Sequence, residues 1–556
     1  MRAAEYLNIR LKEAAESIGL SWPEKVVTEP PKDRKFGDLA CNVAMVLAKE
    51  AGRPPRDIAA ELAAVIKNDG MLSTVEVAGA GFINIRFAPQ FWHQIVLEVL
   101  EKNTGFGSIP AAQNSKKVQI EFVSANPTGP LHIGHGRGAA VGDSLARLLK
   151  FTGYQVQCEY YINDAGRQMK TLGNSVWIRA LELSGQKPEI PEEFYKGDYI
   201  IGIARDMLAS NPDLVKLSPQ EGAGMCFEYA HKVILEWIRE DLEDFRVKFD
   251  VWSSERAILQ SGAVDNVLKR FEQNGLLFEE EDALWFRSSN FGDDKDRVLR
   301  KSSGDLTYVT TDIAYHEQKY ERGFDLLVDI LGADHHGYIP RMRAAIQALG
   351  YDPSAFEVII IQLVNWLKGG EQVAMSTRAG QFETLIDVLD EVGVDAARFM
   401  FLSRKSDSPL DFDLELVKSK SMDNPVYYVQ YAHARICNIF SKAKENGVVS
   451  GGRYDQIDAT VADLEPLCSE DDLQLVRRLD LFPAMLEESA GMLAPHHISF
   501  YLMELAAELH SYYAAVPILA NEDAGIVKAR LAMLAAVAHV LKVGLDLLGV
   551  SAPEKM

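Results

Sequence analysis

One glycine-rich segment constrains the fold of this chain more than any other. The residues 117–123 (KVQIEFV) have the pattern of a strand, and SANPTGPLHIGHG follows, after which helix-forming sequence runs from Arg137 to Phe151. A second strand, YQVQCEYY, comes next, and a further helix begins near Asp164. Strand, helix and strand in this order predict a βαβ unit, which starts a parallel sheet.

The rest of the chain divides around this unit. Strand patterns return in FDLLVDIL and FEVIIIQLV, so a long, mostly helical insertion at about residues 183–280, ending in VKFDVWSSE, splits the sheet domain. We expect an α/β fold with a Rossmann-like parallel sheet, a small α+β N-terminal domain with a strand pair around Gly79 and Gly81, and an all-α C-terminal domain. The expected boundaries are 1–105, 116–412 and 413–556.

Charge and cysteine usage exclude several classes of protein. Lys and Arg number 58 and Asp and Glu 80, for a net charge of −22, so a nucleic acid must bind on a local basic face. The five cysteines form no CxxC pair, which argues against a zinc knuckle or a disulfide framework and for a reducing compartment. The longest apolar run, 531–541, is shorter than the roughly 20 residues of a membrane span. We expect a soluble cytoplasmic protein without a membrane partner.

Two histidines mark the start of the predicted helix. His132 and His135 lie three residues apart, so both imidazoles can face one anion at the positive end of the helix dipole. Such a site suits a triphosphate whose charge increases at the α-phosphorus during attack. A lone H-x-x-H is more simply explained as two surface histidines beside a helix cap, but glycine-rich sequence after a strand favours phosphate binding. Glycines that allow close approach of a ligand are Gly129, Gly134, Gly136 and Gly138.

Two further places carry chemically active side chains. Tyr308 and Asp312 are four residues apart, one helical turn, so they project from one face, although a core aromatic and a structural helix charge explain each one alone. Asp334, His335 and His336 follow a strand and suggest a metal. Three adjacent ligands do not easily converge on one ion, and ligands of parallel sheets bind beyond the strand ends, where this loop falls.

These motifs carry a resemblance to a known family. The string VSANPTGPLHIGHGRGAAVGDSLAR resembles the first signature of class I aminoacyl-tRNA synthetases, and in particular that of the bacterial arginyl-tRNA synthetases. The resemblance continues in order through essentially all 556 residues, in YVTTDIAYH, GADHHGYIPR, VAMSTRAGQF, LDFDLEL, DNPVYYVQYAHARI and GVSAPEKM. It implies a ligase that attaches L-arginine to tRNA-Arg through an arginyl-adenylate and releases AMP and diphosphate. ATP enters as its Mg²⁺ complex, no metal is bound by the protein itself, and the enzyme is a monomer.

The resemblance also assigns residues to the reaction. It makes 116–412 the catalytic domain and implies catalytic roles for His132, His135 and Ser376, to which we add Arg378 as our own hypothesis. It implies ATP contacts for Ser124, His132, Gly134, His135, Gly332, Asp334 and Met375. It implies arginine contacts for Glu121, Asn126, His132, Tyr308, Asp312 and His335, with Glu255 as a weaker second carboxylate for the guanidinium. Carboxylates suit this substrate because a planar guanidinium is best bound by bidentate acidic partners.

The second class I signature departs from its usual form. It is usually similar to KMSKS and here begins at Val373, with Ala374 and Thr377 in the places of both lysines. Some arginyl enzymes carry a compensating lysine just before the H-x-G-H string, where this chain has Gly129. Arg378 or Lys368 is our hypothesis for the cation on the pyrophosphate side.

The outer domains are implied to bind tRNA. The resemblance assigns residues 1–105 to the tRNA elbow, with Phe82 and Asn84 at a D-loop base, and residues 413–556 to the anticodon. The implied anticodon contacts are Tyr428, Tyr431, Tyr513 and Met556, because tyrosines stack on unpaired bases, although the first two also suit a helix core. A local basic face is available from Lys418, Lys420, Arg435, Lys442, Lys444 and Arg453.

Three other functions are weighed against this one. A class I nucleotidylyl transferase, or a synthetase for another amino acid, is disfavoured by the Tyr308 and Asp312 pair and by the length of the resemblance. A metal-dependent hydrolase would use the two histidine groups, and a chelator test separates it from an ATP-dependent ligase. A non-catalytic RNA-binding protein is disfavoured by the intact H-I-G-H string.

Overall fold

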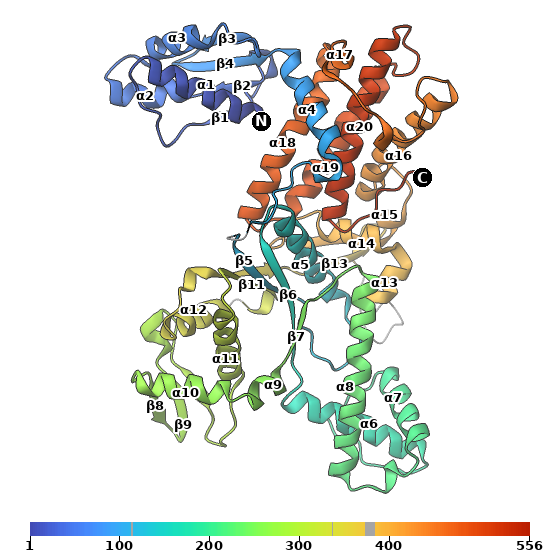
Figure 1. Cartoon of the computed structure of the whole chain (residues 1–556). Coiled ribbons are helices and arrows are strands. Elements are labelled where there is room, and N and C mark those ends of the chain that lie inside the picture. The colour runs from blue at the N-terminus through green and yellow to red at the C-terminus, as the bar shows by residue number, and fades with distance from the viewer. Residues whose placement is uncertain (113–114, 336, 373–383) are drawn as a thin grey trace.

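The computed structural model describes residues 1–112, 115–335, 337–372 and 384–556. Figure 1 shows a parallel sheet in the middle, the N-terminal domain and a helical bundle above it, and two lobes below it.

The N-terminal domain is an antiparallel sheet of four strands in the order β1-β2-β4-β3, with three helices. The predicted strand pair is β3 and β4, which pair from Leu72 opposite Phe87 to Ala78 opposite Phe82. β1 and β2 have two and three residues, too short to show an alternating pattern in the sequence. The elements are α1 (Ala3–Ser17), β1 (Thr28–Glu29), β2 (Leu39–Cys41), α2 (Val43–Ala51), α3 (Pro55–Ile66), β3 (Leu72–Ala78) and β4 (Phe82–Phe87).

The helix after this sheet joins the N-terminal domain to the C-terminal bundle. α4 (Pro89–Lys102) packs against α18 (Glu470–Gly491) and α20 (Ala524–Leu547). His93 Nε2 lies 2.8 Å from the carbonyl oxygen of Leu467, and the backbone N–H of Ala3 donates to Asp480. The N-terminal domain is therefore held against the bundle at several points.

The central sheet has five parallel strands in the order β12-β11-β5-β6-β7. The expected parallel α/β sheet is thus confirmed. The strand order reverses at β5, and a switch of this kind places ligands beyond the carboxyl ends of the strands beside it. The strands are β5 (Lys117–Glu121), β6 (Gln155–Ile162), β7 (Val251–Ser254), β11 (Leu326–Gly332) and β12 (Phe356–Ile361), and α5 (Ile133–Phe151) connects β5 to β6.

The predicted single insertion at 183–280 is two excursions, because β7 lies inside this range and pairs with β6 in the central sheet. β7 has four partly exposed residues at the sheet edge, so no apolar run distinguishes it in the sequence. The first excursion contains α6 (Arg167–Leu183), α7 (Asp198–Ser210) and α8 (Pro219–Asp244). The second contains α9 (Glu255–Gln260), α10 (Ala263–Gln273), β8 (Leu277–Glu280), β9 (Ala283–Phe286) and β10 (Arg297–Arg300), and leads into α11 (Tyr308–Glu321).

The chain then passes through short elements into the C-terminal bundle. β13 pairs with β14 and, in parallel, with β15. The connecting elements are α12 (Tyr338–Ala348), β13 (Val364–Lys368), β14 (Glu371–Gln372), α13 (Leu385–Val392), α14 (Val394–Phe401), β15 (Leu410–Asp413) and α15 (Leu414–Lys418). The bundle helices are α16 (Pro425–Glu445), α17 (Val461–Leu464), α18, α19 (His496–Ala515) and α20.

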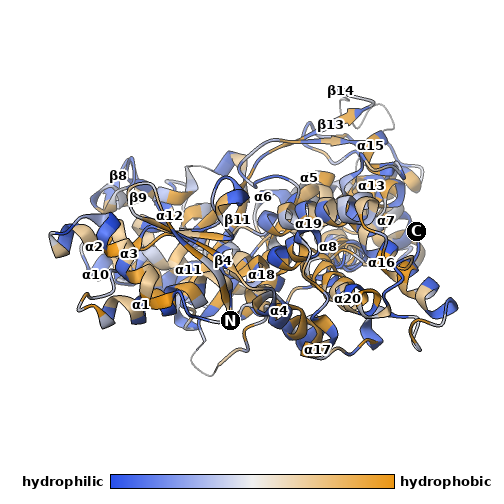
Figure 2. Ribbon diagram, turned by 90° about the horizontal axis from the view of Figure 1, so that it is seen from above, coloured by the Kyte–Doolittle hydropathy of each residue, from blue (hydrophilic) through white to orange (hydrophobic). Residues whose placement is uncertain are grey.

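α20 is more apolar than the short run predicted from the sequence. By length and composition it is apolar enough to cross a membrane, with a mean hydropathy of 1.6 over an 18-residue window. That window is 78% buried, and α16, α18 and α19 pack against the helix. Figure 2 shows it among the apolar residues of its neighbours. Its composition is therefore that of a bundle core helix.

Candidate active site

The turn after β5 holds two side chains in a strained backbone. Val123 and Ser124 have φ angles of 67° and 41°, in the left-handed region that non-glycine residues seldom adopt. The Ser124 hydroxyl donates to Glu121 Oε1 at 3.0 Å and accepts from the Tyr161 N–H at 3.1 Å. Ser124 therefore joins the carboxyl ends of β5 and β6.

His132 and His135 cap the start of α5 reciprocally. His132 Nδ1 accepts from the Gly134 N–H, and His135 Nδ1 accepts from the His132 N–H, each at 3.1 Å. Because both Nδ1 atoms accept, both Nε2 atoms carry the proton and are available as donors. Burial, together with the neighbouring His132, lowers the pKa of His135 to about 4. His135 is therefore a neutral donor at pH 7.

The residue before this pair is bonded to the start of α13. The carbonyl oxygen of Leu131 accepts from the Leu385 N–H at 2.8 Å. His132 also forms a β-bridge with Thr384, the first described residue after the segment 373–383. The start of α5 is therefore connected directly to the start of α13.

The glycines of α5 serve packing more than the sequence indicates. A Cβ at Gly136 would lie 2.8 Å from Leu385 Cδ1, so this glycine allows α13 to approach and is not left for a ligand. Arg137 is fully buried and donates to the carbonyl oxygens of Gln362 and Ser408, each at 2.9 Å. α5 is thus fixed to the segments that follow β12 and precede β15.

A buried ion network lies under the site. Lys319 of α11, 0% exposed, donates to Glu121 Oε2 at 2.6 Å and to Asp329 Oδ1 at 2.8 Å. His316 Nε2 lies 3.0 Å from Asp329 Oδ2. Both oxygens of Glu121 are therefore engaged, one by Lys319 and one by Ser124. Glu159, on the next strand, accepts from the hydroxyl of Tyr315 at 2.9 Å.

The sequence interpretation missed most of this network. The sequence does contain an indication of the network. Glu121, Glu159 and Asp329 each lie toward the carboxyl end of a predicted strand, and such ends meet at one edge of a parallel sheet. Acidic side chains inside apolar strands need partners when buried, and α11 supplies them from Tyr315, His316 and Lys319.

Asp312 of α11 has a different environment. Burial, with the negative charges of Glu121, Glu255 and Asp329, raises its pKa to about 7 against the lowering effect of His316. Glu255 is 5% exposed, its pKa is raised by burial and by Asp164, and its Oε2 has no hydrogen-bond partner among the described residues. Among the described residues, neither carboxylate has an ion-pair partner that would stabilise its charged form. Tyr308, one turn from Asp312, is 60% exposed.

The remaining predicted residues lie at the rim or beyond the described chain. Asn126, Gly332, Asp334 and His335 are exposed, and His335 Nε2 lies 3.7 Å from Asp334 Oδ2. Lys368 is the exposed last residue of β13. Within the described ranges, no group of three or more His, Cys, Asp or Glu side chains suits a metal ion. Of the residues singled out in the sequence, His336 and the signature residues Ala374, Met375, Ser376, Thr377 and Arg378 lie outside the described ranges.

Comparison with known proteins assigns the family. A model described as "tRNA synthetases class I (R), catalytic domain" matches residues 96–438, "Arginyl tRNA synthetase N terminal domain" matches 5–87, and "DALR anticodon binding domain" matches 429–556. An arginine–tRNA ligase of Nitratidesulfovibrio vulgaris (strain DSM 19637 / Miyazaki F) is 58% identical over 100% of both chains.

The chain belongs to the arginyl-tRNA synthetases.

Other relatives agree with this assignment. The arginine–tRNA ligase of Lawsonia intracellularis is 54% identical over 100% of both chains. The arginyl-tRNA synthetase of Thermus thermophilus is 23% identical, covers 100% of each chain and has a TM-score of 0.75, so it shares the fold. Arginyl-tRNA synthetases are class I enzymes that use ATP to charge tRNA-Arg with arginine for protein synthesis.

Two surface pockets contain the residues predicted to contact tRNA. On the N-terminal domain of this arginyl-tRNA synthetase, Phe82, 40% exposed, and the buried Asn84 line one pocket together with Phe36. On the bundle, Tyr431, Tyr513 and Met556 line another.

Arg435 lies between two of these tyrosines, Tyr431 and Tyr513. The sequence suggested Arg435 only as part of a basic face and not as the centre of this pocket. The Arg435 guanidinium carbon is 4.7 Å from the Tyr431 ring centroid and 4.5 Å from that of Tyr513. Tyr428 instead packs against His510, with ring centroids 4.6 Å apart. The structure thus brings three of the four predicted anticodon residues together around a cation.

Proposed function

We propose that this chain attaches L-arginine to tRNA-Arg in two steps, with ATP entering as its Mg²⁺ complex. The arginine carboxylate attacks the α-phosphorus to give arginyl-adenylate and diphosphate. The arginyl group then moves to the 3′ end of the tRNA and AMP leaves. Both steps depend on positioning and charge stabilisation.

The phosphates lie over the start of α5 in this proposal. The Nε2–H groups of His132 and His135 donate to them, and the helix dipole adds to the stabilisation of negative charge. The reciprocal caps fix the orientations of both rings before the substrate binds, so the Nε2–H groups are preorganised as donors. Adenosine-side contacts come from Ser124, Gly134, Gly332, Asp334 and Met375, and Ser376 and Arg378 act on the diphosphate side.

The observation that carries the proposal is the set of carboxylates at Asp312. Burial and neighbouring acids hold its pKa near 7, and the buried Glu255 has one oxygen with no hydrogen-bond partner among the described residues. A guanidinium placed here would pair with charges that otherwise repel one another, so binding of arginine relieves an existing cost. Tyr308 lies one helical turn away on the same side of α11. Other contacts to arginine come from Glu121, Asn126 and His335, with Glu121 held in place by Lys319.

The outer domains hold the tRNA. The pocket with Phe82 and Asn84 takes an unpaired base of the elbow, and the pocket around Arg435 takes anticodon bases by stacking and cation–π contact. Tyr428 supports this pocket from its contact with His510. The domain limits 1–105, 116–412 and 413–556 describe these roles. We place the enzyme in the cytoplasm as a monomer, as is typical of its family.

ATP–pyrophosphate exchange with each amino acid in turn, with and without tRNA-Arg, tests the proposal. Arginine alone among the amino acids should support exchange, and the product should be arginyl-tRNA. Exchange supported by another amino acid, with none for arginine, would remove the substrate assignment.

A further inference from the structure

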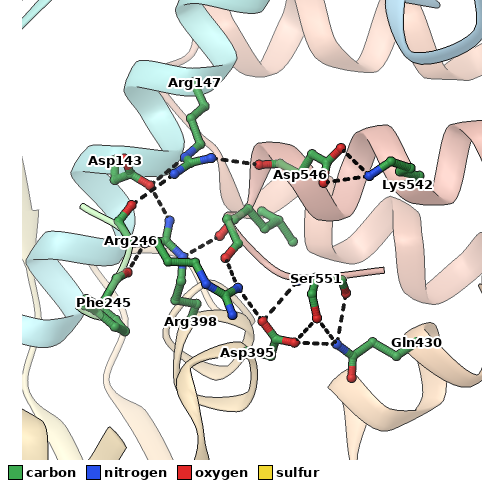
Figure 3. Close-up of polar contacts among 12 residues, drawn as sticks. Asp143, Arg147, Phe245, Arg246, Asp395, Arg398, Gln430, Lys542, Asp546 and Ser551 are labelled. Atoms are coloured by element: carbon green, nitrogen blue, oxygen red, sulfur yellow. Dashed lines mark hydrogen bonds and ion pairs between the residues drawn. The ribbon is translucent and has the colours of Figure 1, made fainter. Parts of the chain in front are cut away.

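A fully buried arginine lies where three segments of the catalytic and C-terminal regions meet (Figure 3). Arg398 of α14 is 0% exposed. Its Nε donates to the carbonyl oxygen of Leu548 at 2.8 Å, and its Nη1 donates to that of Phe245 at 2.9 Å. Its Nη2 donates to the Asp143 carboxylate on α5, the helix that begins with the histidine pair.

The acceptors explain why this residue is an arginine. Phe245 and Leu548 are the C-cap residues of α8 and α20, so their carbonyls are at the negative ends of two helix dipoles. The guanidinium satisfies both carbonyls and the Asp143 charge with one rigid fork. The single ammonium of a lysine does not reproduce that geometry.

The C-terminal segment is shaped around this guanidinium. Gly549 has a φ angle of 68°, and a Cβ on it would lie 2.4 Å from Arg398 Nη2. Arg246, after α8, donates to the Gly549 carbonyl oxygen at 2.9 Å. Asp395 of α14 accepts from the Ser551 N–H at 3.0 Å. The residues 548–551 are therefore held from both sides by α14 and by the end of α8.

The same segment leads to the tyrosine pocket. Gln430 of α16 donates from Nε2 to the Ser551 carbonyl oxygen at 3.0 Å and to Asp395 at 2.8 Å. Four residues separate Ser551 from Met556, which lines the pocket with Tyr431. One short stretch of chain thus contacts the anchor of α5 at one end and the proposed anticodon pocket at the other.

We propose that Arg398 is a positioning residue for the charging reaction, an inference that rests on the proposed function. By joining Asp143 to Leu548, it links α5, with His132 and His135 at its start, to the C-terminal segment. Asp143 is 11 residues from His132, about 16 Å along a helix at 1.5 Å per residue, so Arg398 acts through the helix and does not touch the substrate. A change here shifts or rotates α5 as a whole.

The test compares Arg398→Lys with a matched control, Arg530→Lys. Arg530 is also nearly buried and donates to Asp472 and to the Pro517 carbonyl oxygen, but these contacts lie within the bundle. We expect Arg398→Lys to lower kcat of arginine-dependent exchange and of charging roughly 10- to 100-fold, with KM for ATP and arginine within about twofold, since small displacements of reacting groups act on kcat. We expect both substitutions to lower Tm by similar amounts, but Arg530→Lys should leave kcat within about twofold of the wild-type value.

Two further variants test the same link between α5 and the C-terminal segment. If Arg398→Lys does not fold, Asp143→Asn replaces it, with the same expected loss of kcat. Ser551→Ala weakens the other hold on the segment and should lower kcat about threefold in the wild type but add little to Arg398→Lys, because both changes break one link.

A folded Arg398→Lys or Asp143→Asn enzyme with wild-type kcat would overturn this inference while leaving the proposed function intact. A wild-type enzyme that does not charge tRNA-Arg would instead overturn the proposed function, and this inference with it.

Discussion

At the scale of single residues, Asp312 is a carboxylate with no ion-pair partner in the described part of the chain. Asp312 has a pKa of about 7 because burial and three acidic neighbours oppose its ionisation. Lys319, by contrast, already neutralises Glu121 and Asp329. Two sets of acids therefore occupy one region. One set is paired within the protein, and the other is the set that we propose to bind the guanidinium of arginine.

Replacing Asp312 by asparagine should raise KM for arginine about 100-fold. That factor corresponds to about 3 kcal/mol, the loss of charge-assisted hydrogen bonds to a guanidinium. KM for ATP should change little in the same exchange assay. Glu321→Gln, an exposed change at the end of α11, is the matched control. An unchanged KM for arginine in Asp312→Asn would place the guanidinium elsewhere.

Arginine binding should depend on pH through the same group. In the proposed binding mode the guanidinium pairs with the ionised carboxylate, so binding lowers the pKa of Asp312 and is favoured above its free value of about 7. KM for arginine should rise about tenfold from pH 8 to pH 6. The Asp312→Asn enzyme should lack this dependence, and a wild-type KM that stays flat over this range would contradict the assigned pKa.

At the scale of elements, α5 shows how packing fixes the site. A Cβ at Gly142 would lie 2.3 Å from the Phe122 ring, whereas one at Gly138 meets nothing within 4 Å. Gly142→Ala should therefore reduce the free energy of unfolding by about 1–3 kcal/mol through overpacking. Gly138→Ala should raise it by about 0.5–1 kcal/mol through helix propensity. Thermal unfolding of the two variants checks the signs, and equal Tm values would contradict this view of α5.

The elements divide into those that the sequence predicts and those that it does not. The βαβ unit at β5, α5 and β6 was predictable because a strand pattern, a glycine-rich turn and a helical period follow in order. β7 was not, because four half-exposed residues carry no periodicity and only pairing with β6 makes them a strand.

The candidate site shows the same division. The sequence motifs single out His132 and Asp312 as candidates, but they do not predict the hydrogen bonds and charges around these two residues. The partners of Glu121 are Lys319, 198 residues further along the chain, and Ser124, held by an unusual backbone angle. Contacts between segments this distant depend on the fold as a whole.

At the scale of the whole molecule, an acidic enzyme that binds tRNA needs local binding sites, because its overall negative charge repels the RNA backbone. The net charge is −22, so overall charge does not attract tRNA, and our proposal assigns anticodon binding to the tyrosine pocket around Arg435. Arg435→Ala should weaken tRNA-Arg binding about tenfold, by loss of cation–π and stacking contacts. Filter binding measures this, with a tRNA of altered anticodon as the control, for which the substitution should make little difference. Equal losses for both tRNAs would argue against anticodon recognition in this pocket.

The most direct test of the central claim is calorimetric titration of the enzyme with L-arginine at pH 7, in buffers of different ionisation enthalpy. With a free pKa of about 7 at Asp312, binding should release about half a proton per arginine, and L-citrulline, whose side chain is neutral, should bind at least 100-fold more weakly. Arginine binding without proton release, or citrulline binding as tightly as arginine, would contradict the proposal that this carboxylate holds the guanidinium.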